Sequence, residues 1–318
     1  MWYTTKWVNN TGWRGGRGTG GRGRRGTGGR IEIDLIHTIS IQPNLRFYEI
    51  MGYPVPFDAE LYFQYSSTQN SKKNLTKKPS SRHFSRDQKS PFMDEYIQEI
   101  QRLKSTFQSI PFVEQIFLCN SISFNALDEN SDIDLFIIAK PWRIWSVKFW
   151  SMILFTFKWA KRFWKKSRKK ICLSFFVTSD SQNLYPISLP SLDVYLAYRI
   201  AHLVLIYQPE NQNNNSFFQN NKRVKWILPN YQEKQTISLW IDYFTWNTKF
   251  KNVIERVGDW FLWNIFERTV KLIQKAIINL KRVRNPVWNK DVIVSDSMLK
   301  FHQDIREKVS LKYNIKVK

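Results

Sequence analysis

An apolar run with two acidic residues at its start constrains this chain more than any other feature. The segment Ile133–Ile138 predicts a buried strand, yet Asp134 lies within it and Asp132 directly before it. Side chains two apart in a strand point to one face, so the carboxylates share a face while Ile133 and Leu135 enter a core. Two such carboxylates repel unless a cation lies between them, and hard oxygen ligands suit Mg²⁺.

A second apolar run, Val113–Leu118, precedes this segment and ends in Cys119, Asn120 and Ser121. A serine at a strand end, next to backbone amides that open a helix, can hold phosphate oxygens. An Asp-x-Asp pair alone is common at solvated edges and turns, so the flanking strands carry the interpretation. Together the two runs predict a phosphate-binding turn near Ser121 beside a magnesium site that begins at Asp132.

The spacing of apolar residues predicts the surrounding elements in the order helix, strand, strand, helix, strand. We therefore expect an α+β fold, with a small mixed sheet, helices packed to one side of it and a helical C-terminal domain. The predicted helices are Met93–Ser109, Trp142–Lys166, Leu192–Tyr207, Thr236–Arg284 and Asp296–Lys308. The predicted strands are Val113–Leu118, Ile133–Ile138, Ile171–Val177 and Asp291–Val294.

Composition divides the chain further. Ten of the 12 glycines lie in Gly12–Gly29, interleaved with arginines, so residues 1–30 are expected to form a disordered basic arm. Such an arm is typical of a segment that binds the phosphates of RNA or DNA. The alternatives are a solvated tail and a stretch translated from a misplaced start codon. The remaining expected parts are a small, partly ordered region at 31–65, a polar linker at 66–90, a core domain at 91–190 and the helical domain at 191–318.

The balance of charges predicts an anionic partner. Lys and Arg number 49 against 26 Asp and Glu, a net charge of +23, which favours a nucleotide, a nucleic acid or an acidic membrane surface. Two cysteines are too few for a disulfide framework. No apolar run reaches the roughly 20 residues of a spanning helix, and no secretory signal is recognisable. We therefore expect a cytoplasmic protein without a transmembrane segment.

A basic, tryptophan-rich stretch, Trp142–Lys170, offers a second candidate interface. Eight Lys and Arg residues within 158–170 alternate with tryptophans, which is typical of a surface that contacts phosphates and stacks on bases of RNA or DNA. An amphipathic helix on anionic lipid is one alternative. The other is a helix whose aromatic face packs on the sheet while its lysines are solvated.

The Ser-Asp-Ile-Asp-Leu core at Ser131–Leu135, with the strand and Asn120-Ser121 before it, resembles the nucleotidyltransferase superfamily related to DNA polymerase beta. The likeness is closest to uncharacterised bacterial nucleotidyltransferases and continues through Lys140–Trp145, Lys170–Phe176, Leu228–Asn230 and Met298–His302. Asn120 stands where that superfamily usually has glycine. Members of that subgroup often begin with a small winged-helix-like region, and Phe47–Val55 resembles a piece of it, which implies a degenerate winged-helix-like region at 31–65.

This resemblance implies transfer of a nucleoside monophosphate from an NTP such as ATP to an unknown acceptor, with two Mg²⁺ ions and release of pyrophosphate. By position, Asp132 and Asp134 would be the catalytic metal ligands. Asn120, Ser121 and Ser131 would contact the nucleotide. Members carry a third carboxylate on the next strand, and Asp180, just past Ile171–Val177, is the candidate here. The alternative is a non-catalytic nucleotide- or nucleic-acid-binding protein that keeps the fold.

Overall fold

The computed structural model describes part of the chain. The described residues are 47–48, 50–51, 53, 90–162, 169–189, 193–208, 216–228, 231, 244–245, 249–257, 260–285, 292–301, 306 and 309. The predicted arm at 1–30 lies outside them, as do all of the linker except Ser90 and most of the region at 31–65.

The described strands form one seven-stranded sheet in the order β5-β4-β1-β2-β3-β7-β6. They are β1 (Val113–Cys119), β2 (Ile133–Ala139), β3 (Ile171–Thr178), β4 (Val204–Gln208), β5 (Phe244–Thr245), β6 (Ile293–Val294) and β7 (Met298–Lys300). Strands β2 and β3 are parallel, whereas β1 is antiparallel to both of its neighbours. The sheet is therefore mixed, and the α+β class is confirmed.

The two helices next to the central strands were predicted closely. Helix α4 spans Met93–Ser109, as the three- and four-residue spacing of its buried apolar side chains indicated. Helix α5 (Ile144–Arg162) crosses from β2 to β3, which permits their parallel pairing. Trp145 near its start is almost fully buried, so this part of the tryptophan-rich stretch packs in the core.

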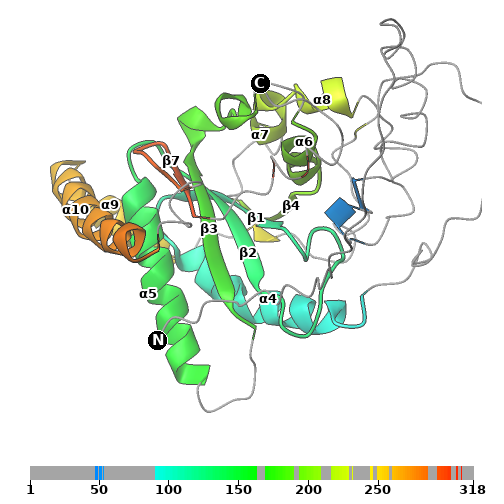
Figure 1. Ribbon diagram of the computed structural model, residues 1–318. Coiled ribbons are helices and arrows are strands. Elements are labelled where there is room, and N and C mark those ends of the chain that lie inside the picture. The colour runs from blue at the N-terminus through cyan, green and yellow to red at the C-terminus, as the bar shows by residue number, and fades with distance from the viewer. Residues whose placement is uncertain are drawn as a thin grey trace, which may run out of the picture. The chain divides into compact units, whose positions relative to one another are not determined.

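Helices cover both faces of the sheet, and the prediction that they lie on one side was wrong (Figure 1). One face packs against α4, α5 and α10 (Trp260–Arg284) and includes Ile133, Leu135 and Ile137 of β2. The other face, which includes Phe136 and Ile138, packs against α6 (Val194–Ala201), α7 (Ser216–Asn220) and α8 (Val224–Ile227). Every side chain of β2 is buried because each face of this central strand has its own helical cover.

The residues after 191 contribute strands as well as helices to this sheet, so a separate helical domain is not confirmed. The predicted helix Leu192–Tyr207 was wrong beyond Ala201, because β4 pairs there with β1. The predicted helix Asp296–Lys308 was wrong at Met298–Lys300, which pairs with β3 as β7. Within Thr236–Arg284 the described helices are α9 (Lys249–Val257) and α10.

Two aromatic residues from the N-terminal third complete one core. Phe47 and Tyr48 are fully buried, and the Phe47 ring stacks on Tyr198 of α6 at a centroid distance of 4.1 Å. The Tyr48 hydroxyl lies 2.8 Å from Nε2 of His202. These contacts make residues before position 90 part of the folded unit.

Within the described ranges, no helix combines the length and apolar character needed to cross a membrane.

Candidate functional site

Asp134 occupies the second position of β2 and lies between two cysteines. Its Cα pairs with Cys119 of β1 on one side and with Cys172 of β3 on the other. Directly opposed residues in adjacent strands place their side chains on the same face, so the carboxylate has a thiol on each side. Asp134 is only 7% exposed, so it is the buried member of the acidic pair.

Asp132 provides the exposed half of the pair. It directly precedes β2 and is exposed, while Ile133 between the two acids is fully buried in the opposite core with Leu135. The predicted alternation is therefore present, with two apolar anchors on one face and two acids on the other. Asp132 is therefore open to solvent, whereas Asp134 is buried.

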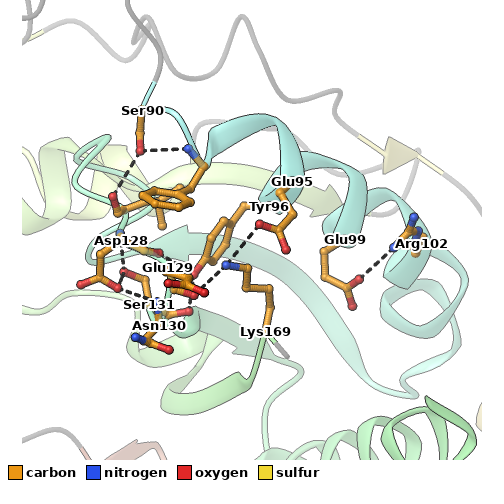
Figure 2. Close-up of polar contacts among 12 residues, drawn as sticks. Ser90, Glu95, Tyr96, Glu99, Arg102, Asp128, Glu129, Asn130, Ser131 and Lys169 are labelled. Carbon is orange, nitrogen blue, oxygen red and sulfur yellow. Dashed lines mark hydrogen bonds and ion pairs between the residues drawn. The ribbon is translucent and has the colours of Figure 1, made fainter. Parts of the chain in front are cut away.

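The loop before Asp132 is fixed by hydrogen bonds, which Figure 2 shows. The Ser131 hydroxyl accepts a bond from the Asp128 backbone amide at 2.9 Å and donates to the Asp128 carboxylate at 3.0 Å. The Tyr96 hydroxyl of α4 donates to the backbone oxygens of Asp128 and Ser131. The Ser131 side chain therefore contacts both its own turn and Tyr96, and it fixes the backbone directly before Asp132.

Lys169 secures the same loop from the side that leads into β3. Its ammonium donates to the Glu129 carbonyl at 2.8 Å and lies 4.3 Å from the centre of the Tyr96 ring. It also lies 3.4 Å from the Glu95 carboxylate, and the Lys169 side chain is only 4% exposed (Figure 2). Helix α4, this lysine and the loop thus form one support for the acidic pair.

The predicted phosphate-binding turn begins beside Asp134, because Cys119 at the end of β1 is its pairing partner. Asn120 has a φ of 59°, in the left-handed region that glycine adopts freely and that asparagine tolerates better than most residues. Its carbonyl accepts from the Ser123 hydroxyl and from the Phe124 amide. Ser121 is partly exposed in this turn, and its carbonyl accepts from Ala126 at 2.8 Å.

Asp180 is not brought to this site, and its assignment as the third acid was wrong in position. It lies in the short 3-10 helix Ser179–Ser181 after the last residue of β3. Asp134 pairs with Cys172 near the start of β3, whereas Thr178 at its end pairs with Ala139. Six residues of extended strand place Thr178 roughly 20 Å from Cys172. Asp180 therefore cannot share a metal ion with Asp134.

The positions of β3 next to Asp134 carry sulfur and hydroxyl groups in place of an acid. Burial raises the pKa of the Cys172 thiol, and the Asp134 carboxylate, which hydrogen-bonds it, raises that pKa further. Burial and the same carboxylate also raise the pKa of the Cys119 thiol. Ser174, two residues along β3, is buried and interacts with Cys119. Both cysteines are therefore neutral thiols at physiological pH.

An arginine that the sequence analysis did not single out lies close to these groups. The Arg199 guanidinium of α6 donates to the Tyr195 hydroxyl and lies over the Tyr195 ring. Its positive charge opposes the rise in the pKa of Cys119. Burial raises the pKa of Tyr53 to about 12, with Arg199 lowering it and Asp134 raising it. Tyr53, Arg199 and Asp134 thus lie within electrostatic reach of one another, although no spacing in the sequence connects them.

The acidic pair fits Mg²⁺ by donor chemistry, since carboxylate oxygens are its preferred protein ligands. Asp132 is open to solvent and Asp134 lies on the same side of β2, so an ion and the oxygens of a bound phosphate could reach both. Among the described residues no three His, Cys, Asp or Glu side chains group as metal ligands. A second ion would therefore need phosphate and water oxygens beyond these two carboxylates.

No protein-family model, curated protein or solved structure matches this chain.

Proposed function

We propose that the protein binds a nucleoside triphosphate with Mg²⁺ at Asp132 and Asp134 and transfers its nucleoside monophosphate to an acceptor. The observation that carries this proposal is the register of β1 and β2, which puts the turn of Asn120 and Ser121 beside Asp134. Two carboxylates and a serine turn are then neighbours at one end of the central strands. That combination suits a metal-bound triphosphate.

The residues have separate roles in this proposal. Asp132 and Asp134 hold the ion, which would neutralise charge on the triphosphate when bound. The Ser121 hydroxyl binds a phosphate oxygen, and Arg199 adds positive charge on the α6 side. The acceptor hydroxyl attacks the α-phosphorus while the bond to the bridging oxygen breaks and pyrophosphate leaves. The proton of the acceptor hydroxyl passes to water or to a substrate phosphate. The β3 positions nearest to Asp134 are Cys172 and Ser174, neither of which is a carboxylate that could accept it.

A specific observation favours a second candidate, a nucleotide-binding protein without transferase activity. The third carboxylate expected from the resemblance is missing from the described neighbourhood of Asp134, where β3 has Cys172, and Asp180 is roughly 20 Å away. Binding requires only the metal ligands and the phosphate contacts, whereas deprotonation of an acceptor is helped by a base. The two candidates therefore share a binding site and differ in turnover.

Calorimetric titration of each NTP, with and without Mg²⁺, tests the shared site. We expect Mg²⁺-dependent binding that Asp134→Asn and Asp132→Asn abolish, with thermal melts showing that both variants fold. Asp180→Asn is the matched control: it removes the same charge at the other end of β3 and should leave binding unchanged. Binding by Asp134→Asn equal to that of the parent protein would exclude this site.

Turnover is measured separately. The protein is incubated with each labelled NTP and a cell lysate, and both labelled products and released pyrophosphate are recorded. Mg²⁺-dependent labelling that Asp134→Asn abolishes supports the transferase. Binding without pyrophosphate release or labelling supports the non-catalytic candidate instead.

A further inference from the structure

Helix α10 has a second apolar face that the described fold does not cover. The helix spans Trp260–Arg284, 25 residues, which is about 37 Å of helix. One face is buried through Glu267, Val270, Gln274 and Ile278 and contacts α5. In Figure 1 the helix lies beside α5. The exposed apolar side chains of α10 are Leu262, Ile265, Leu272, Ile273, Ile277, Leu280 and Val283.

These residues form a stripe along one side of the helix because they recur at helical spacing, with the exposed Thr269 between Ile265 and Leu272. Taking 3.6 residues per turn, most of them fall within one third of the helix circumference, opposite Val270 and Gln274. Their exposed fractions run from 45% for Ile277 to 82% for Val283. A surface helix normally presents polar side chains there, and a contiguous exposed apolar patch marks an interaction site.

Basic residues border this stripe. Arg268, Lys271, Lys275 and Arg282 lie along the edge between the stripe and the buried face, at intervals of three, four and seven residues. The single acid of α10 is Glu267, which is buried and accepts bonds from the backbone amides of Trp145 and Ser146 at 2.8 Å. The outward surface of α10 therefore combines an apolar stripe with basic residues, of which Lys271 pairs with the Asp296 carboxylate at 2.6 Å.

The charge identifies the kind of partner. A second copy of the chain would bring its own bordering lysines and arginines toward those of the first. These like charges repel, in a protein of net charge +23, so a second copy is a poor partner for this surface. An anionic lipid surface is complementary in both respects, since acyl chains accept the stripe and headgroups pair with the lysines and arginines.

We propose that α10 binds anionic phospholipid membranes, lying in the plane of the interface with the stripe of Leu262 to Val283 inserted. The helix keeps its contacts with α5 through the opposite face, so no unfolding is needed. This membrane surface is independent of the acidic pair on β2, and neither proposal requires the other.

Vesicle co-sedimentation without nucleotide tests the proposal on the full chain. The vesicles are phosphatidylcholine mixed with phosphatidylserine, and phosphatidylcholine alone. We expect binding to the mixed vesicles that weakens with salt, and much weaker binding to the neutral ones. The double variant Leu272→Glu with Leu280→Glu should bind the mixed vesicles at least about tenfold more weakly, because two inserted leucines are lost and two negative charges are added.

Trp226→Glu is the matched control, since it places a glutamate at another exposed apolar residue, on α8. It should bind as the parent does, and thermal melts should show all variants folded. Three results would overturn the proposal: no binding of the parent to mixed vesicles, equal binding by the double variant, or equal loss in Trp226→Glu. A parent that is dimeric in solution, with a monomeric double variant, would also overturn it, because a second copy would then cover the stripe.

Discussion

His202 should make the fold sensitive to acid, because the structure holds its imidazole neutral. The ring is 3% exposed, with Nδ1 2.9 Å from the Tyr198 carbonyl oxygen. A carbonyl only accepts, so Nδ1 carries the proton and Nε2 accepts from the Tyr48 hydroxyl at 2.8 Å. The ring also stacks on Phe124 at a centroid distance of 4.3 Å. A second proton would bury a positive charge among these aromatic groups.

The size of the effect follows from the pKa. Burial lowers the pKa of His202 from 6.5 to about 3. Below about pH 6.5 the unfolded chain binds a proton that the folded chain does not bind until about pH 3, so stability falls as pH falls through that window. The slope is about 1.4 kcal/mol per pH unit, and integration from about pH 7 to about pH 4.5 gives a loss of about 2.5 kcal/mol.

Urea unfolding at a series of pH values measures this loss. The informative variant is His202→Phe combined with Tyr48→Phe, which removes the titrating group, leaves no hydroxyl without its acceptor and keeps an aromatic ring beside Phe124. Tyr48→Phe alone is the control, because it retains His202. The control should lose stability with acid as the parent does, and the double variant should lose about 2.5 kcal/mol less. Parallel pH profiles for the parent and the double variant would refute the reasoning.

Three further outcomes are expected. Burial lowers the pKa of Lys251 to about 8, so between pH 8 and pH 10.5 the unfolded chain binds a proton that the folded chain does not. The free energy of unfolding of the parent should therefore rise with pH in this range, by about 1.4 kcal/mol per pH unit more than that of Lys251→Met, as urea titrations above pH 8 would measure. Cys119 is buried, Cys172 is partly buried and both have raised pKa values, so they should react with a thiol reagent at pH 8 far more slowly in the folded than in the unfolded protein, and equal rates would contradict this protection. A chain that starts at Met93 should unfold at lower urea than one that retains Phe47, whose truncation to alanine alone should cost about 3 kcal/mol.

Periodic patterns in the sequence were sufficient where an element buries its own residues continuously. Helix α4 shows the apolar spacing of its buried face, and its bounds were predicted as Met93–Ser109. Strand β2 was recognisable because Ile133 to Ile138 is apolar apart from Asp134 and is rich in isoleucine, which is β-branched. Neighbouring strands and helices reinforce these local preferences, so local reasoning and the fold agree.

Short edge elements could not be predicted because their partners decide their conformation. Strand β7 has three residues, Met298–Lys300, and it is a strand because it pairs with Phe175–Val177 more than 100 residues earlier. Strand β4 follows helix α6 after only His202 and Leu203, without a glycine or proline to mark the boundary. In both cases long-range pairing prevailed over local helical preference.

The misplaced third acid had a topological cause that the sequence already contained. A helix of some twenty residues between two buried strands favours a parallel crossover, in which both strands run the same way. Asp134 lies at the start of β2, so a neighbour on β3 has to come from the start of β3, which is Cys172, and not from Asp180 beyond its end. Arg199 and Tyr53 carried no such signal, because only tertiary packing brings them toward Asp134.

The setting of Asp134 links stability to ligand binding. A buried carboxylate loses hydration, and the Cys172 thiol that hydrogen-bonds it is neutral and leaves its charge in place. Asp132 adds a second negative charge two residues away that repels the first, while Arg199 lies within electrostatic reach of Asp134, and a bound cation would reduce the repulsion between the two carboxylates. An uncharged residue at position 134 would remove the repulsion between the two acids without disturbing Ile133 or Leu135 on the other face.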